Sequence, residues 1–282
     1  MSRVEQLHQE LEQLKPISVA LQRRWEQQLM IDLNYNSNRI EGNTLTYGQT
    51  QLLLMFGKTT GNADMRDLEE MKAHNAGLKM VKQYASDKER PLTTAFIREL
   101  NGTILKEDFW KNAITQDGQS TRMKVKVGVY KTRPNSVITS TGALFEYASP
   151  EETSALMSDL VEWYSSAEKM ALLSPIALAS LLHYRYIRIH PFEDGNGRIA
   201  RLLVSYVLER HGYPMVIVPA TERNNYIDAL NLCDINTGNV PADGAAATIE
   251  QIKPFLEYMT GLLEKTLEHY IQSVKESRPQ NT

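Results

Sequence analysis

Hydrophobic residues recur at helical spacing over most of the chain. Three leucines in the first 14 residues lie three and four positions apart, which predicts a helix that Pro16 interrupts. The same spacing resumes from Leu21 through Trp25 to Leu29. Similar patterns predict helices over about residues 64–84 and 94–105.

Capping residues predict where several further helices begin. Small polar residues precede helix-compatible runs at Thr46, Ser149 and Ser174. Pro191 requires the last of these helices to stop near His190, and the next helical run, RIARLLVSYVLERHG, ends at Gly212. Thr221 is expected to cap a short helix. The final helix has two possible starts, one at Thr248 with Gln251 and one at Pro254.

One segment has the pattern of strands. VKVGVY and SVITS are β-branched runs on either side of KTRPN, which predicts a hairpin over residues 125–140. The predicted fold class is therefore mostly α with one small β-hairpin.

Composition limits the classes of function. The chain has 282 residues, of which 42% are hydrophobic, and no apolar run approaches the roughly 20 residues that span a bilayer. The charged N-terminus is not a secretory signal, and the single Cys233 excludes an intrachain disulfide. We therefore expect a cytoplasmic protein. A net charge of −3 without a basic block argues against nucleic-acid binding.

The segment IHPFEDGNGRIAR, residues 189–201, concentrates the candidate chemistry. GNGRIA matches the glycine pattern of a dinucleotide-binding turn, but that turn follows a strand, whereas here a predicted helix enters the loop. A plain helix–loop–helix joint would not explain why Asp194, Asn196, Arg198 and Arg201 are so close together. An anion site explains the cluster better.

Gly195, Asn196 and Gly197 at a helix start present unpaired backbone N–H groups, which bind anions together with the helix dipole. Arg198 and Arg201 are three positions apart, so both can face one oligophosphate. An acidic residue is expected in such a place if it holds a cation, so Asp194 is a candidate Mg²⁺ ligand. The residues thus predict a Mg-nucleotide between two helices, with His190 as the base.

HPFEDGNGRIAR resembles the signature of the Fic family, H-P-F-x-D-G-N-G-R-x-x-R, at every fixed position. The resemblance implies a helical Fic core over residues 63–240 with a hairpin flap. It leaves an N-terminal helical region over 1–62 that carries an inhibitory motif, and a C-terminal helical segment over 241–282.

The activity that the resemblance implies is transfer of AMP from Mg-ATP to a Ser, Thr or Tyr hydroxyl of a target protein or of the protein itself. His190 would deprotonate that hydroxyl, and Asp194 would bind Mg²⁺ on the α- and β-phosphates. The 195–197 turn would form the anion hole. Arg198 would neutralise charge on the pyrophosphate, and Arg201 would bind the γ-phosphate.

SNRIEG, residues 37–42, resembles the inhibitory pattern [ST]-x-x-x-E-[GN] of many Fic proteins. The match implies that Glu41 pairs with Arg201 and keeps the arginine away from the γ-phosphate. Ser37 would fix the inhibitory helix by hydrogen bonding, and Gly42 completes the motif. The same glutamate could instead orient a water molecule for removal of AMP.

Two further sites follow from the resemblance. The segment from about 128 to 142 corresponds to the flap, whose exposed edge would pair with an extended segment of the target protein. ERNNYIDALNLCD resembles the adenine-side helix, in which Tyr226 and Asp234 would line the base pocket. This chain has Ile227 where relatives have a second tyrosine, and Asp234 where they have an asparagine.

Two other kinds of function remain possible from the sequence. A Fic enzyme could remove AMP or transfer another nucleotidyl or phosphoryl group, and a non-catalytic module could report nucleotide binding to a partner. His183 and His74 receive no role, and no carboxylate or cysteine pattern supports a metal pair at His183. His183 is expected in the core or at its rim, and His74 in a polar helical stretch.

Overall fold

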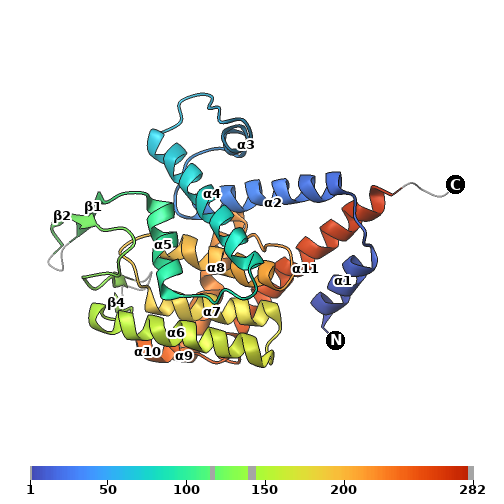
Figure 1. The fold of residues 1–282 in the computed structure, drawn as a ribbon. Helices are drawn as coiled ribbons and strands as arrows, with labels where there is room; N and C mark the ends of the chain where they lie inside the picture. The colour runs from blue at the N-terminus through green and yellow to red at the C-terminus, as the bar shows by residue number, and fades with distance from the viewer. Residues whose placement is uncertain (1, 115–117, 139–143, 279–282) are drawn as a thin grey trace.

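The computed structural model describes residues 2–114, 118–138 and 144–278. It confirms a mostly helical fold (Figure 1). In chain order the elements are α1 (Arg3–Gln13), α2 (Val19–Ile40), α3 (Tyr47–Phe56), α4 (Met65–Ser86), α5 (Thr94–Leu105), β1 (Phe109–Ile114), β2 (Ser120–Val125), β3 (Val137–Ile138), β4 (Leu144–Phe145), α6 (Pro150–Met170), α7 (Pro175–Ile189), α8 (Asn196–Arg210), the 3₁₀ turn η1 (Ala220–Glu222), α9 (Arg223–Thr237), α10 (Pro241–Ala245) and α11 (Lys253–Glu276).

Helices α7 and α8 form the centre of the molecule, and the short loop 190–195 joins them (Figure 1). Both are buried on nearly every side, as expected for helices whose apolar residues are not confined to one stripe. Helix α4 packs against α8, α6, α10 and α11 pack against α7, and α9 packs against α11. The two ends of the loop are therefore held by buried helices.

The two ends of the chain meet on one side. Helix α1 lies against α11, and the Trp25 ring of α2 stacks on Tyr270 of α11 with centroids 4.5 Å apart. One continuous hydrophobic cluster includes residues from both termini and from the centre of the chain. The division into three segments stays a prediction.

Most predicted helix starts are confirmed. Thr46 and Ser149 form capping boxes, the Ser174 hydroxyl accepts a hydrogen bond from the first turn of α7, and Gly57 ends α3 in the left-handed region. Helix α2 continues through the polar stretch that follows Leu33. Asn34, Ser37 and Asn38 are buried there because they face polar groups of α4 and α8.

The predicted hairpin over 125–140 is wrong. Strand β1 pairs with β2, and β3 pairs with β4, so each run has a different partner from the one expected. The backbone N–H of Gly128 donates to the Asn101 side chain at 2.8 Å, and that of Lys131 donates to the Pro191 carbonyl at 2.8 Å. The segment between the two sheets is thus bound to helix α5 and to the central loop.

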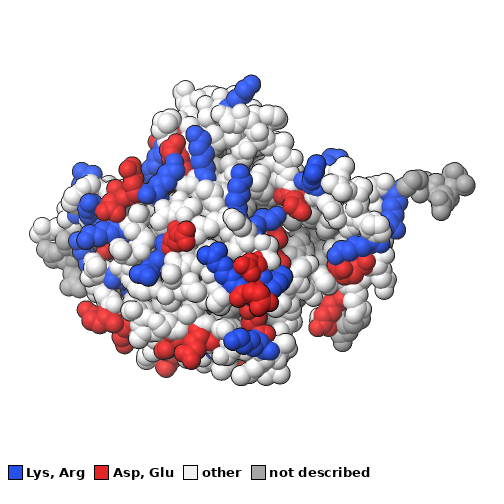
Figure 2. All heavy atoms as spheres, in the orientation of Figure 1, with Lys and Arg blue, Asp and Glu red and all other residues white. Residues whose placement is uncertain are grey.

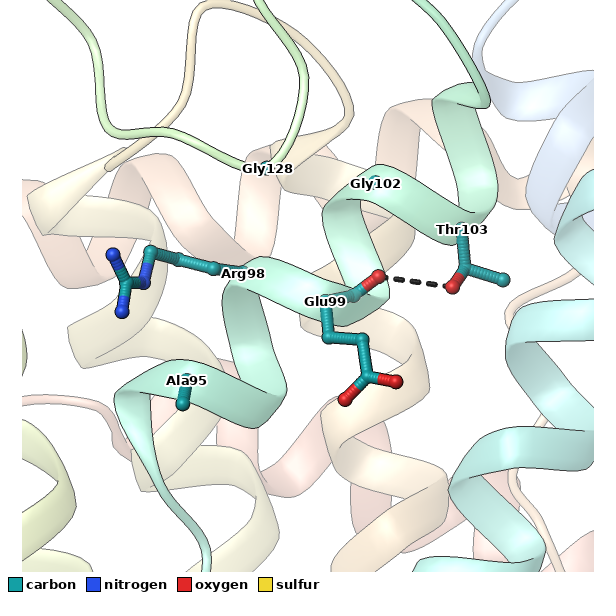
Figure 3. Close-up of a pocket in the computed structure, with 6 residues that line it drawn as sticks. All are labelled: Ala95, Arg98, Glu99, Gly102, Thr103 and Gly128. Atoms are coloured by element: carbon teal, nitrogen blue, oxygen red, sulfur yellow. Dashed lines mark hydrogen bonds between the residues drawn. The ribbon is translucent and has the colours of Figure 1, made fainter.

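Gly128 crosses α5 at Gly102 in ordinary van der Waals contact. Its Cα lies 4.0 Å from the place of a Cβ on Gly102, and its φ of 71° suits glycine. Figure 3 shows Gly128 over the turn of α5 that carries Gly102, at the rim of a shallow depression beside Arg98 and Thr103. This crossing brings Gly128 to Asn101, which reaches the central loop.

The C-terminal elements correct one prediction and settle another. Thr221 lies inside η1, and α9 begins at Arg223 without a side-chain cap. Both candidate helix starts near the C-terminus correspond to turns in the structure. Pro254 lies in the first turn of α11, while Thr248 and Gln251 bind each other's backbone N–H groups in the preceding turn.

Among the helices in the described part of the chain, none is both long and apolar enough to cross a lipid bilayer. Lysine and arginine side chains alternate with aspartate and glutamate over the face drawn in Figure 2, and none of the basic groups there merges into a large patch. This face offers no extended binding surface for a polyanion.

Candidate active site

The site begins where α7 ends. His190 takes the left-handed conformation, with φ of 51°, and its N–H still donates to the Tyr186 carbonyl at 2.9 Å. Pro191 disfavours a further helical turn at this point. The chain therefore leaves the helix abruptly, and the histidine lies at the edge of the loop.

Asparagine side chains fix the loop from both sides. Asn196 accepts from the Phe192 N–H at 3.1 Å and donates to the Phe192 carbonyl at 2.7 Å. Asn135 donates to the carbonyls of His190 and Phe192 at 3.1 and 3.0 Å. Buried Lys131 donates to Asn135 at 2.8 Å and to the Ile189 carbonyl at 3.0 Å. The loop backbone is thus held by Asn196 at its own end and by side chains from the distant segment 131–135.

The N-terminus of α8 is left open by this arrangement. Gly195 precedes the helix with φ of 82°, and no side chain caps it. The first backbone N–H groups of a helix have no acceptor inside the helix, and they carry the positive end of its dipole. Asn101 fixes the preceding residue by donating to the Asp194 carbonyl at 3.0 Å. The 195–197 turn therefore has the geometry of an anion site.

The Asp194 carboxylate lies between two cations. Lys111 of β1 contacts one oxygen at 2.7 Å, and Arg198 contacts the other at 3.3 Å. Burial opposes ionisation, but Lys111 and then Arg198 outweigh it and lower the pKa of Asp194. The carboxylate is therefore charged at neutral pH.

Arg201 points in the opposite direction, towards the end of α2. Its Nε donates to the Ser37 hydroxyl at 3.0 Å, and its Nη2 donates to the Ser37 carbonyl at 2.9 Å and to Glu41 Oε1 at 2.7 Å. The guanidinium is buried, and Glu41 raises its pKa against the effect of burial. The structure thus brings together Ser37, Glu41 and Arg201, as the inhibitory motif implies.

Glu41 also covers the anion site. A methyl group built on Gly197 would overlap the Glu41 carboxylate, so this carboxylate lies directly over the first turn of α8. Its side chain is still 40% exposed. Among the described contacts, one guanidinium N–H of Arg201 donates to Glu41. The ion pair is therefore less buried than the bidentate pair that such a motif suggests. Gly42 only ends the helix, with φ of 98°.

His190 is neutral in this environment. Protein atoms surround much of its ring, and this burial, followed by the charge of Lys131, lowers the pKa of His190 to about 3. The Ile187 carbonyl, Glu41 and Asp194 oppose the shift. Because Nδ1 is buried, Nε2 is the nitrogen that can accept a proton from a substrate.

Tyr147 is the close neighbour of His190 that the sequence does not reveal. The two rings stack with centroids 4.0 Å apart and planes 20° from parallel. Tyr147 follows β4 by two residues and packs edge-on against Phe145 of that strand. The position of the β3–β4 sheet is thereby linked to the histidine.

The two residues expected in the base pocket lie in different places. The Tyr226 hydroxyl shares a hydrogen bond of 2.8 Å with His183 Nε2, and the Arg201 guanidinium carbon lies 6.0 Å from the Tyr226 ring. Asp234 instead accepts from Tyr184 at 2.7 Å and from Arg188 at 3.2 Å. Tyr226 therefore lies on the Arg201 side of the site, and a base contact by either residue stays a prediction.

Both unassigned histidines are buried behind the arginines. His74 is not in a polar stretch facing solvent, because its Nδ1 is 2.7 Å from Asn34 Oδ1 and its ring is enclosed. Burial lowers the pKa of His183 to about 3 and that of His74 well below its usual value. Two neutral imidazoles therefore lie close to Arg201, and neither one neutralises its charge.

A helical core that presents a histidine, a carboxylate and two arginines around a glycine turn defines a Fic-domain protein. The Fic/DOC family profile matches residues 91–208. The crystal structure of a Fic domain containing signaling protein from Bacteroides thetaiotaomicron is 52% identical over the whole of both chains, with a TM-score of 0.91. The chain belongs to the Fic/DOC family.

The names of more distant relatives state an enzymatic activity. Protein adenylyltransferase Fic of Drosophila yakuba is 30% identical over 84% of this chain and 41% of its own length. A structure of Fic-1 residues 134–508 from Caenorhabditis elegans covers 98% of this chain at 25% identity, with a TM-score of 0.73. The chain spans less than half the length of the curated relatives it matches.

Proposed function

We propose that this protein transfers AMP from Mg-ATP to a hydroxyl group of a protein, and that Glu41 suppresses the transfer in the resting state. The observation that carries the proposal is the position of the Glu41 carboxylate, over Gly197 and against Arg201. A carboxylate in this place uses the positive groups that would otherwise bind phosphate oxygens.

Different residues of the site have different roles in the proposed reaction. The N–H groups of the 195–197 turn and Arg198 bind the phosphates and stabilise the charge that develops on the leaving pyrophosphate. His190 Nε2 accepts the proton of the target hydroxyl as its oxygen bonds to the α-phosphorus and the bond to pyrophosphate breaks. A neutral imidazole is required for this step, and the low pKa of His190 provides it.

Asp194 fits a magnesium ion. Its carboxylate is 19% exposed and already has the Lys111 ammonium 2.7 Å from one oxygen, which shows that a cation can stand there. No group of three or more acidic, histidine or cysteine side chains that could hold a metal occurs among the residues the structure describes. A single carboxylate completed by phosphates and water is the usual arrangement for Mg²⁺, which would neutralise phosphate charge when bound.

Inhibition follows because Glu41 and the γ-phosphate would compete for Arg201. The γ-phosphate would need Arg201, whose side chain is occupied by Ser37 and Glu41. The end of α2 must therefore release the guanidinium before a triphosphate can lie along α8. Since Glu41 is 40% exposed, it can leave without opening the core.

The test is label transfer from ATP labelled at the α-phosphate. We expect wild type to modify itself or an added protein weakly, and Glu41→Gly to raise the rate by at least about tenfold, the factor for about 1.4 kcal/mol of released competition. Adding His190→Ala to that variant should lower the rate about 10³-fold. A Glu41→Gly protein that is folded, binds ATP and transfers no label would refute the proposal.

A second direction of catalysis has one observation in its favour. The Glu41 carboxylate is partly exposed and lies beside the phosphate site, where it could hold a water molecule for attack on an AMP-modified hydroxyl. Release of AMP from a modified target by wild type, and its loss in Glu41→Gly, would show removal. Release that is equal in both proteins would exclude this role for Glu41.

A further inference from the structure

The β1–β2 sheet touches the candidate metal ligand through one side chain. Lys111 extends from β1, and its ammonium lies 2.7 Å from Asp194 Oδ2. Arg198 takes the other oxygen, Oδ1, at the longer distance of 3.3 Å. Oδ2 therefore has the closer cation, and that cation comes from outside the loop that forms the site.

Lys111 reaches Asp194 across an open groove of about 680 Å³. The groove lies between β1, the start of α4 and the 190–201 loop. Four of its other charged residues form two pairs, Lys106 with Glu69 and Arg66 with Glu70. Two further acidic side chains line the groove, Asp194 and Glu107, and Lys111 contacts Asp194.

We propose that Lys111 is a built-in competitor of the divalent cation at Asp194. The inference rests on the proposed function only in taking Asp194 as the metal ligand. An ammonium on Oδ2 takes one of its lone pairs and repels a divalent cation, so each weakens the binding of the other at this oxygen. Metal binding is therefore stronger when Lys111 swings away, and the occupancy of the site is linked to the β1–β2 sheet.

The exposure of the two partners makes the exchange feasible. The Lys111 side chain is 50% exposed and can turn into solvent without disturbing the core, whereas Asp194 is 19% exposed and stays in place. Pairs in such partly exposed positions are weak. Lys111 therefore tunes the affinity for the metal by a small factor and does not block the site.

Electron paramagnetic resonance of Mn²⁺ tests the competition directly, because it counts free and bound metal without any turnover. The full chain is titrated with Mn²⁺ alone and with Mn²⁺ plus ADP. Lys111→Met keeps the apolar stem and removes the charge. The matched control is Lys124→Met, because Lys124 lies on the partner strand, is 47% exposed and pairs with Asp108 at 3.3 Å.

We expect Lys111→Met to bind Mn²⁺ about 3- to 5-fold more tightly than wild type in both titrations, and Lys124→Met to match wild type. Equal affinity in wild type and Lys111→Met would overturn the inference, as would weaker binding in Lys111→Met, which would mean that the lysine helps to hold the ligands. If Lys111→Met binds Mn²⁺ alone more tightly but ADP binds to none of the proteins, the competition between Lys111 and the metal is supported and the proposed function is refuted.

Discussion

Two segments meet at the N-terminus of α8, and they are held very differently. The 190–195 loop is held at five points, because the Asn135 and Asn196 side chains make four hydrogen bonds with its backbone and the Lys131 N–H donates to the Pro191 carbonyl. The end of α2 reaches the same helix through three hydrogen bonds from Arg201, one of them to a carboxylate that is 40% exposed. The first segment is a scaffold, and the second is a releasable contact.

The difference indicates how one site can be both ordered and suppressed. Leaving the buried polar groups of the loop without partners would be costly, so the loop keeps one conformation. The Glu41 carboxylate is partly exposed, so another anion can take its place at the buried guanidinium. Inhibition therefore needs no rearrangement of the scaffold, and three substitutions test this contrast.

Gly197→Ala should have the largest effect. The added methyl group would occupy the place of the Glu41 carboxylate, where we propose that a phosphate binds over the first turn of α8. We expect label transfer in a Glu41→Gly background to fall about 10²-fold, the usual cost of losing anion-hole contacts.

Measuring Gly197→Ala in the Glu41→Gly background separates an effect on phosphate binding from an effect on the position of Glu41. If Gly197→Ala lowers transfer in Glu41→Gly protein, phosphate and glutamate share one place, as the comparison requires. If it leaves transfer unchanged in that background, the methyl group disturbs only the glutamate, and the shared-place account is wrong. Thermal melting of both proteins checks that the scaffold is intact.

Tyr147→Ala tests the environment of the base and should have an intermediate effect. With the stacked ring present, the pKa of His190 is about 3, so its neutral fraction, and with it the rate, should not change between pH 8 and pH 5.5. Without the ring, water reaches the imidazole, the desolvation is lost, and the pKa rises towards 6.5. We then expect about a tenfold lower rate at pH 5.5 than at pH 8.

Tyr147→Phe is the matched control, because it keeps the stacked ring and removes only the hydroxyl. Its rate should stay flat over the same pH range in the Glu41→Gly background. A sloping profile for Phe, or a flat one for Ala, would show that stacking does not set the protonation of His190.

Ser37→Ala should have the smallest effect. It removes the hydroxyl that accepts from Arg201 Nε at 3.0 Å but keeps the Ser37 carbonyl and the Glu41 contact. A lost hydrogen bond of about 1 kcal/mol predicts a rise in basal transfer of about fivefold. An unchanged rate would mean that Glu41 alone holds the arginine.

The sequence predicts the helices well because their signals are local. Capping residues at Thr46, Ser149 and Ser174 act within one turn, and Pro191 stops α7 through its own geometry. The 190–201 segment is also readable, since its glycines, arginines and carboxylate are neighbours in the chain. The inhibitory contact joins residues 160 positions apart, and it could be expected only from the family pattern.

The residues that sequence reasoning missed act over long separations. Asn101 binds a carbonyl 93 positions away, and Asn135 binds the loop from 55 to 57 positions away. Residues 125–140 failed as a hairpin for the same reason, because Gly128 and Lys131 find distant hydrogen-bond partners. The expected target-docking edge at 128–142 includes residues 139–142, which lie outside the described residues, and it stays a prediction.

Calorimetric titration with Mg-ATP tests the central claim most directly, namely that Glu41 and a triphosphate compete for Arg201 and the first turn of α8. We predict that Glu41→Gly binds Mg-ATP at least about tenfold more tightly than wild type, while AMP, which has no γ-phosphate, shows a smaller difference. Equal affinity for Mg-ATP in both proteins, or no binding in either, would contradict the account.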